Sequence, residues 1–585
     1  MIVRLRRLAL ACTSLGAVLS SGARAGAPPP GAAGASPSRE EAPLRRPGDV
    51  ETAFPVTFEH HGYFRLRSEL LLNGNLGARI GSIPEPLAAR AGADEDASTL
   101  GWAGVRLRYA PTLRIGPDLA IHVGIDALDG LVLGSTHEGA GGLVAANGFG
   151  GAVGDSQASP SAGDFGWRDA VTVREAWAEV RLFDMVDVAA GRMPDQFGLG
   201  ILRNAGSARD ADGGTIVDRV KVGATLSDFR LEAAWEFTAT GSTSELVSAT
   251  DRGAGGQPKD LGQSDDVTTY AFRLGRWPTT MGEREARRAL LEEKRTWAFD
   301  WALFSTFTDQ KNSTSEPLPE ASLSCRAEAT LTNGQRATDA DCIRLFPRNA
   351  FFWRPGAWFK AERRPDAVTH IRIEAEVGAL IGSVEHPQRE VDADIESPKE
   401  FIGFGGAIEL EWQRRAWTFG LAFGFATGDN GRVLGVRDGQ EIVDPNDDGF
   451  ATNTAVLNNR TITSYVFNGD YRVDLLLFRQ VIGSVTNAVY FKPWVARDII
   501  QNDDFTLSLR LDALYAAAAK PSGTPGRGDQ WGIEFDGQVD MHWTNGLDIA
   551  LTAGLLIPLD ALSDPETGKV GTPAFATRVL MGWRF

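Results

Sequence analysis

The strongest pattern in the chain, from about residue 56 onward, is the alternation of apolar and polar positions. In residues 368–381, Ile371 and Ile373 alternate with Glu374 and Glu376. A period of two places successive side chains on opposite faces of an extended chain, and it is typical of a β-strand with one apolar and one polar face. The chain therefore predicts a protein built from β-strands.

About eighteen segments carry this alternation. They begin near His61, Trp102, Asp118, Val171, Val186, Thr215, Asp228, Val267, Thr296, Phe352, Val368, Phe401, Trp417, Val485, Phe505, Asp529, Leu547 and Phe575. Long and short connections alternate between them, and residues 278–294 form a medium connection with helical spacing. Transmembrane barrels have this rhythm, because their periplasmic turns are short and their extracellular loops are long.

The expected fold is all-β: a closed antiparallel transmembrane β-barrel of about 18 strands, with short periplasmic turns and long extracellular loops. Tilted strands of about ten residues are long enough to cross a bilayer. The sheet has to close, because an open edge in lipid would leave backbone N–H and C=O groups unpaired. On strand 529–543 we expect Trp531, Ile533 and Phe535 to face outward. The alternative is a soluble sheet whose apolar face is covered by another layer, which gives no reason for the rhythm of the connections.

The amino-terminal region predicts export. Arg4, Arg6 and Arg7 precede a short apolar stretch, residues 8–19, and Ala23-Arg24-Ala25 is typical of a signal-peptide cleavage site. Cys12 lies inside the apolar stretch, too early for a lipid-attachment site. The expected division is a signal peptide at 1–25, a disordered Pro- and Ala-rich periplasmic leader at 26–50, and an outer-membrane barrel at 51–585.

Composition excludes one class of partner. The formal net charge is −17, whereas binding to nucleic acid requires a basic surface. We expect the chain to contact outer-membrane lipid and a hydrophilic solute, and no nucleic acid. The pattern leaves the oligomeric state undetermined.

The last strand resembles the carboxy-terminal assembly signal of bacterial outer-membrane barrels, since the chain ends at Phe585 and has Val579, Met581 and Trp583 at alternate positions. The resemblance implies recognition by the barrel assembly machinery. Residues 61–70 and 174–202 are similar to large porin-type barrels, of which the alginate-export family is the nearest, and the whole chain resembles uncharacterised long barrels of myxobacteria. Alginate exporters are implied to have eighteen strands and an arginine-rich interior. The charged positions here are mixed in sign, so that substrate is not carried over.

With the apolar faces turned to lipid, the polar faces line the pore. The predicted basic lining is Arg65, Arg67, Arg106, Arg108, Arg578 and Arg584, and the resemblance to porin-type barrels adds Arg192, which follows Gly191. The predicted acidic lining is Glu374, Glu376, Glu409 and Glu411. A basic wall facing an acidic wall would create a transverse field and set selectivity. The alternative is a lining that neutralises itself and has no preference.

Two stretches are candidates for constricting a barrel wide enough to hold an aqueous channel. They are residues 194–213, which are rich in glycine, and the long stretch before Ser484. Residues 471–480, YRVDLLLFRQ, are too apolar for a free loop. The sequence leaves open whether they form a packed plug or an extension of a strand.

Other chemistry is weakly indicated. Asp444, Asn446 and Asp448 followed by Gly449 match the first half of a calcium-binding loop, but the twelfth position is Ala455 instead of Glu. An acidic turn is the alternative, and no other cofactor is expected. No Ser lies in a nucleophile elbow, so we expect no enzymatic activity.

The function expected from the sequence is an outer-membrane channel, porin-like, for passive or facilitated diffusion of small hydrophilic solutes through a lumen of mixed charge. The alternatives are an export channel for a polysaccharide with periplasmic partners, and a plugged barrel that serves as a surface adhesin or scaffold.

The first testable prediction concerns Cys325 and Cys342, which lie in one polar stretch of an exported chain. Disulfides form in oxidising compartments outside the cytoplasm, so we expect these two residues to pair. Mass measurement after alkylation without reduction should show no modified thiol on the mature chain. Two alkylated thiols would reject the disulfide.

Overall fold

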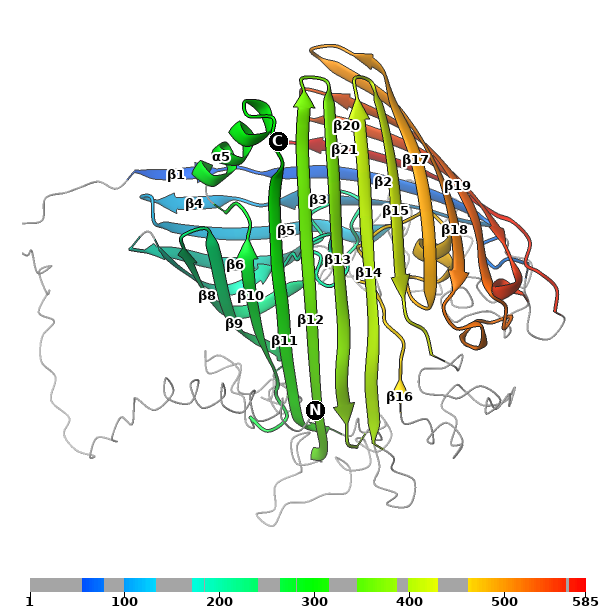
Figure 1. Cartoon of the computed structure of the whole chain (residues 1–585), viewed down its shortest axis with the longest axis horizontal. Coiled ribbons are helices and arrows are strands. Elements are labelled where there is room, and N and C mark those ends of the chain that lie inside the picture. Colours follow the sequence, from blue (N-terminus) through cyan, green and yellow to red (C-terminus); the bar gives the residue numbers. More distant parts are fainter. Residues whose placement is uncertain are drawn as a thin grey trace, which may run out of the picture.

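The computed structural model describes residues 55–77, 99–132, 171–183, 185–239, 263–279, 281–314, 345–386, 398–429, 461–563 and 568–585. Within these ranges the chain forms a single closed antiparallel β-barrel whose strands are strongly tilted relative to one another (Figure 1). The predicted fold class is confirmed.

Eighteen strands of the described residues form the wall. They are β2 (Gly62–Leu72), β3 (Thr99–Tyr109), β5 (Leu119–Val132), β6 (Val171–Leu182), β7 (Val186–Pro194), β8 (Ile216–Leu226), β9 (Phe229–Ala239), β10 (Val267–Arg276), β11 (Ala298–Thr314), β12 (Leu345–Asp366), β13 (Thr369–Val384), β14 (Lys399–Arg414), β15 (Trp417–Ala426), β17 (Ala488–Gln501), β18 (Phe505–Ala518), β19 (Gln530–Trp543), β20 (Leu547–Pro558) and β21 (Ala574–Arg584). Each pairs antiparallel with its neighbour along the chain. The last wall strand pairs with the first, with register from Tyr63↔Arg584 to Leu72↔Phe575, and this pairing closes the barrel.

Three short strands complete the sheet. β1 (Val56–Glu59) and β4 (Thr112–Ile115) pair with each other and prolong β2 and β3 beyond the breaks at His60-His61 and Ala110-Pro111. Proline has no N–H to donate to a ladder and commonly marks such a break. β16 (Thr461–Ile462) pairs in parallel with the start of β14.

The connections follow the predicted rhythm. Short turns join β8 to β9 and β19 to β20, for example, and all the short turns lie at one end of the barrel, opposite the long connections. The exception is also as expected: residues 277–297, between β10 and β11, contain the helix α5 (Met281–Glu292), which lies beside the ends of β11 and β12 (Figure 1). In the described ranges no helix is long and apolar enough to cross a membrane.

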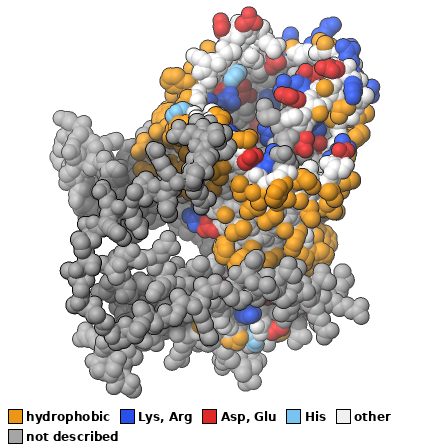
Figure 2. All heavy atoms as spheres, turned by 90° about the vertical axis from the view of Figure 1, so that its left-hand side faces the viewer, with side chains coloured by type: hydrophobic (Ala, Val, Ile, Leu, Met, Phe, Trp, Pro, Cys, Tyr) orange, Lys and Arg blue, Asp and Glu red, His pale blue; other side chains and the backbone are white. Residues whose placement is uncertain are grey.

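The outer face of the wall is apolar. Side chains that would be buried in a soluble protein are exposed around it, including Val222, Trp235, Phe419, Leu511 and Phe535, and Leu511 is 64% exposed. Figure 2 shows a band of hydrophobic side chains with charged and polar side chains above it. A contiguous apolar belt around a closed barrel is the surface that faces hydrocarbon in outer-membrane barrels. The apolar residues of the last strand belong to it, since Trp583 and Phe585 are exposed.

One predicted orientation is wrong. We expected Trp531 to face outward with Ile533 and Phe535, but its side chain is only 5% exposed and its indole N–H donates to the carbonyl oxygen of Asn487 at 2.9 Å. The reason is a bulge at the start of β19: the register passes from Gly532↔Ala516 to Gln530↔Ala517 and skips Trp531. A bulge re-aims the side chain of the residue that it leaves unpaired.

The lipid-facing belt generates a prediction on β19. Phe535 faces outward near the middle of the strand, whereas Gln538 faces inward and bonds to Asp540. Phe535→Arg places a charge in hydrocarbon and should lower the free energy of unfolding in lipid bilayers by about 2–4 kcal/mol. The matched change Gln538→Arg, in the aqueous interior, should lower it by less than about 1 kcal/mol. Equal losses for both variants in denaturant titrations would contradict this assignment of the two faces.

Candidate functional site

The inner face of the wall carries most of the charge of the described strands. The ladder register determines which residues share this face: Arg65 lies opposite Arg106, and Glu374 lies opposite Glu409. The inner-face charged residues include Arg65, Arg67, Glu69, Arg106, Arg108, Asp126, Arg219, Glu232, Glu236, Arg273, Arg354, Glu374, Glu376, Glu409, Glu411, Lys492, Asp512, Glu534, Asp536, Asp548 and Arg578. The interior is therefore polar and mixed in sign.

Two connections fold back inside the barrel. The first inward segment, residues 195–215, joins β7 to β8, and the second inward segment, residues 463–487, joins β16 to β17. The segments also bond to each other, since the amide of Asn468 donates to the carbonyl oxygen of Ile201 at 2.8 Å. Both segments, which the sequence predicted to turn inward, also contact inner-face residues of the wall, as described below. Their role as a constriction stays a prediction.

One wall carboxylate binds three consecutive amides of the first inward segment. Glu376, almost fully buried on β13, accepts hydrogen bonds from the amides of Gly200 (2.8 Å), Ile201 (3.2 Å) and Leu202 (3.0 Å). Consecutive N–H groups that point to one place form a nest for an anion. Gly200 has a φ of +91°, a backbone conformation that glycine adopts without steric cost. The glycine permits the turn, and the glutamate pairs the amides that the turn exposes.

The second inward segment is held in the same way. Glu534, on β19, accepts hydrogen bonds from the amides of Leu475 (3.0 Å), Leu476 (2.8 Å) and Leu477 (2.7 Å). Asp474 then accepts from the amides of Phe478 (2.9 Å) and Arg479 (3.1 Å), which belong to the short π-helix Leu477–Val481. This settles the question left open for residues 471–480: they are a packed inward element and not an extension of a strand.

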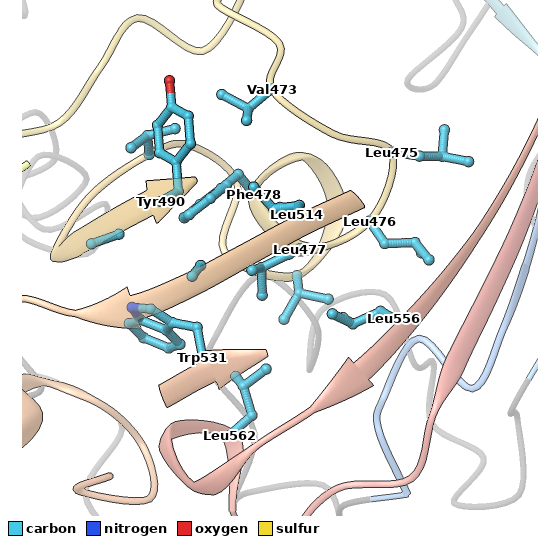
Figure 3. Packing of buried hydrophobic residues seen from close by; sticks show 14 of the residues in the cluster. Val473, Leu475, Leu476, Leu477, Phe478, Tyr490, Leu514, Trp531, Leu556 and Leu562 are labelled. Atoms are coloured by element: carbon cyan, nitrogen blue, oxygen red, sulfur yellow. The ribbon is translucent and has the colours of Figure 1, made fainter. Parts of the chain in front are cut away.

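Apolar side chains of the second segment pack against the wall. Leu476, Leu477 and Phe478 are buried with Tyr490 and Leu514 of the neighbouring strands, as Figure 3 shows. The inner wall here contributes apolar side chains beside the carboxylate of Glu534. Burial of this cluster therefore fixes the segment to one side of the barrel.

The predicted basic wall serves as an anchor for the first segment. Arg65 donates to the carbonyl oxygens of Arg209 (2.9 Å) and Ala211 (3.0 Å), and Arg106 also donates to Ala211 at 2.9 Å. Arg108 donates to the carbonyl oxygen of Gly206 at 3.1 Å and forms a two-point ion pair with Asp126, at 2.6 and 2.7 Å.

Two further predicted arginines pair with carboxylates of the same segment. Arg67 lies 2.5 Å from Asp212, and Arg578 donates to Asp210 at 2.7 Å. Arg479, from the second segment, also donates to Asp210. Burial alone would raise the pKa of Asp210, but Arg479, Arg578 and Arg67 outweigh it and hold that pKa below its usual value. The stabilisation from these pairs is complete above a pH of about 4 and is lost as the pH falls through the lowered pKa.

The predicted acidic wall also carries its own counter-charge. Arg372 lies between three of its members, at 2.8 Å from Glu374, 3.2 Å from Glu409 and 3.4 Å from Glu411. Glu376 is bound to the first inward segment. Local pairing on both walls weakens a field across the barrel, and it favours the alternative of a self-neutralising lining.

The remaining two predicted lining residues each pair with a carboxylate. Arg584 lies on the inner-face register of β21 and pairs with Asp548 at 3.2 Å near the short-turn end. Arg192 forms a two-point ion pair with Asp218, at 2.7 Å for both contacts, and both residues belong to the lining of the larger cavity described below.

Sequence reasoning missed a buried ionic cluster among the described residues. Asp195, fully buried at the start of the first segment, lies 2.6 Å from Arg203, 3.0 Å from Arg219 and 2.5 Å from Arg273. Glu236 adds a two-point pair with Arg203 at 2.7 and 2.8 Å. The sequence did contain a signal for this cluster, because Arg219, Glu232 and Glu236 lie on the polar faces of the two strands in residues 216–239. The cluster joins the first inward segment to three consecutive wall strands, β8, β9 and β10.

Two cavities lie between the inward segments and the wall. The larger, about 830 Å³, is lined by Arg174, Arg203 and Arg354 and by the hydroxyl groups of Thr238, Thr269 and Thr308, which bond to one another across three strands. Among the described residues Arg354 has no ion-pair partner, and it belongs to the lining of this cavity. The second cavity, about 690 Å³, lies against β2 and β3. Cavities of this size accommodate small solutes.

Five predicted site residues lie outside the described residues: Cys325, Cys342, Asp444, Asn446 and Asp448. The disulfide and the calcium loop stay predictions. In the described ranges no group of three or more His, Cys, Asp or Glu side chains is arranged to hold a metal ion.

No family model and no curated protein matches the sequence. Among solved structures, the chain is similar to Acinetobacter baumannii OccAB3 (9% identity, TM-score 0.44, 90% of this chain and 99% of that one) and to Pseudomonas aeruginosa OpdL (8%, 0.42, 90% and 99%). It is also similar to Pseudomonas aeruginosa OccK2 (OpdF) in complex with glucuronate (9%, 0.41, 90% and 98%). These identities and TM-scores are too low to transfer a property of those proteins to this chain.

The anchor at Glu376 can be tested by hydrogen exchange. Glu376→Ala leaves the amides of residues 200–202 without an acceptor, and hydrogen bonds to a charged group are each worth about 1.5–3 kcal/mol. We expect local opening to become easier by at least about 2 kcal/mol, which means roughly thirty-fold faster exchange of these amides. Glu411→Ala, on the same wall but paired only with Arg372, is the matched control and should leave that exchange unchanged. Unaltered protection in Glu376→Ala would refute the anchoring role.

Proposed function

We propose that the chain is an outer-membrane channel for diffusion of small hydrophilic solutes through a lumen of mixed charge. The observation that carries the proposal is the arrangement of the interior. Two inward segments are fixed to the wall by buried carboxylates on β13 and β19, and polar cavities remain between the segments and the wall. Anchored inward loops narrow a pore without filling it, so size selection follows from their position.

The charges that line the path support weak charge selectivity. Most inner-face arginines are neutralised by a nearby carboxylate, as Arg108 is by Asp126. Arg354 differs, because it faces the larger cavity from β12 without an ion-pair partner among the described residues. Fixed charges on a pore wall set ion preference, so Arg354 should give the channel a slight preference for anions.

A plugged barrel is the second candidate, and one observation favours it. The second inward segment buries a cluster of leucine and aromatic side chains against β17 to β19, which is more apolar packing than a water-filled lumen needs. The alternative of polysaccharide export with periplasmic partners rests on the alginate-export resemblance alone. No contact among the described residues supports it.

Planar-bilayer recording tests the proposal. Protein refolded into lipid should give discrete conductance steps, and a salt gradient should give a reversal potential that indicates a slight anion preference. Arg354→Ala should shift that potential toward cation preference, because it removes a positive charge from the lining of the larger cavity.

The matched control is the double change Arg364→Ala with Glu292→Ala, which removes an exposed ion pair between β12 and α5, outside the lining of the larger cavity. It should leave the reversal potential unchanged. If inserted, folded protein gives no conductance at any salt concentration, the channel is excluded and the plugged barrel is favoured.

A further inference from the structure

The second cavity has a chemical character different from that of the larger one. Three separate parts of the chain form it: the inner face of β2 and β3, the end of the first inward segment, and residues 469–483 of the second. Its lining includes Trp102, Arg67, Glu69, Arg472 and Gln480. It lies in the half of the barrel nearer the long connections, since β2 ends and β3 begins there.

The charges around this cavity balance. Four arginines (Arg67, Arg472, Arg479 and Arg578) are held by four carboxylates (Glu69, Asp210, Asp212 and Asp470). Arg472, for example, lies 2.8 Å from Asp212 and 3.6 Å from Asp470. A balanced network attracts neither anions nor cations overall, because each ion would meet repulsion as close as its attraction.

The same network is dense in hydrogen-bonding groups of both kinds. Guanidinium groups only donate and carboxylates only accept, whereas the amide of Gln480 does both. Gln480 also bonds to Glu69 at 3.2 Å, which fixes its orientation at the wall. A solute that matches this lining must offer several donors and acceptors close together, and no net charge.

Trp102 adds a flat apolar surface. It lies on the inner face of β3, directly opposite Glu69 in the ladder, and is half-buried beside the apolar cluster. The indole ring therefore adjoins a carboxylate and the arginines that pair with it. An aromatic plane beside donor–acceptor pairs complements a molecule that has one face of C–H groups and a rim of hydroxyl groups.

We propose that this cavity is a binding subsite for an uncharged sugar, in which Trp102 stacks against the C–H face of a pyranose ring. The Arg67, Arg472 and Glu69 side chains and Gln480 then exchange hydrogen bonds with its hydroxyl groups. The subsite rests on the proposed channel function, because it lies on the path that a solute would take between the long-loop end and the constriction. Its volume of about 690 Å³ is sufficient for a mono- or disaccharide.

Isothermal titration of the full chain in detergent tests the subsite, with glucose, maltose and sucrose as probes and sodium gluconate as a charged comparator. At least one sugar should bind saturably, and gluconate should bind more weakly. Trp102→Ala should weaken sugar binding at least ten-fold, and Trp102→Phe, which keeps an aromatic plane, by less.

Trp494→Ala is the matched control, because Trp494 also lies on the inner face but stacks with Arg510 outside this cavity. It should leave binding unchanged. A heat-modifiable mobility in gels confirms that each variant is folded.

Three results would overturn the subsite: no binding of any of the three sugars, tighter binding of gluconate, or equal losses in Trp102→Ala and Trp494→Ala. The two proposals fail in different ways. Sugar binding by protein that gives no conductance would exclude the channel and keep the subsite, whereas conductance without sugar binding would do the reverse.

Discussion

The pairing of backbone groups in hydrocarbon is the constraint from which the rest of this structure follows. A strand that crosses a bilayer has no water to satisfy its N–H and C=O groups, so every strand needs a neighbour on both sides. The chain meets this requirement by pairing its last wall strand with its first. Closure also determines the two environments of the wall, since alternate side chains must face lipid or the enclosed space.

The enclosed space creates a second problem, because a wide barrel has more interior than wall side chains can fill. Two inward segments occupy part of this space. Both are attached to the wall by the same interaction, in which a buried glutamate accepts hydrogen bonds from three consecutive backbone amides. Glu376 and Glu534 lie on different strands and hold unrelated sequences. In each case the carboxylate satisfies backbone donors that would otherwise be buried without a partner. Ion pairs such as Asp210 with Arg578 and Arg479 then fix the segments laterally.

The sequence was sufficient for the wall but insufficient for what lies inside it. Alternation predicts each wall strand, because lipid imposes one apolar face on all of them, and the contrast of long and short connections orients the barrel. The error in side-chain orientation arises where the alternation is interrupted, because a bulge turns Trp531 inward. The anchors at Glu376 and Glu534 depend on contacts between residues far apart in the chain. Each looks like an ordinary polar position of a strand, so a one-dimensional pattern could not distinguish them from the lining.

The central claim, closure of the barrel by β2 and β21, is tested most directly by an engineered disulfide. Leu66 and Met581 are register partners on these strands, and residues directly opposite in an antiparallel pair are close enough for a disulfide. The double variant Leu66→Cys with Met581→Cys should form the cross-link in lipid. The variant Leu66→Cys with Leu580→Cys should not, because its second side chain faces the lumen. Absence of the first cross-link, or efficient formation of the second, would contradict the closed barrel described above.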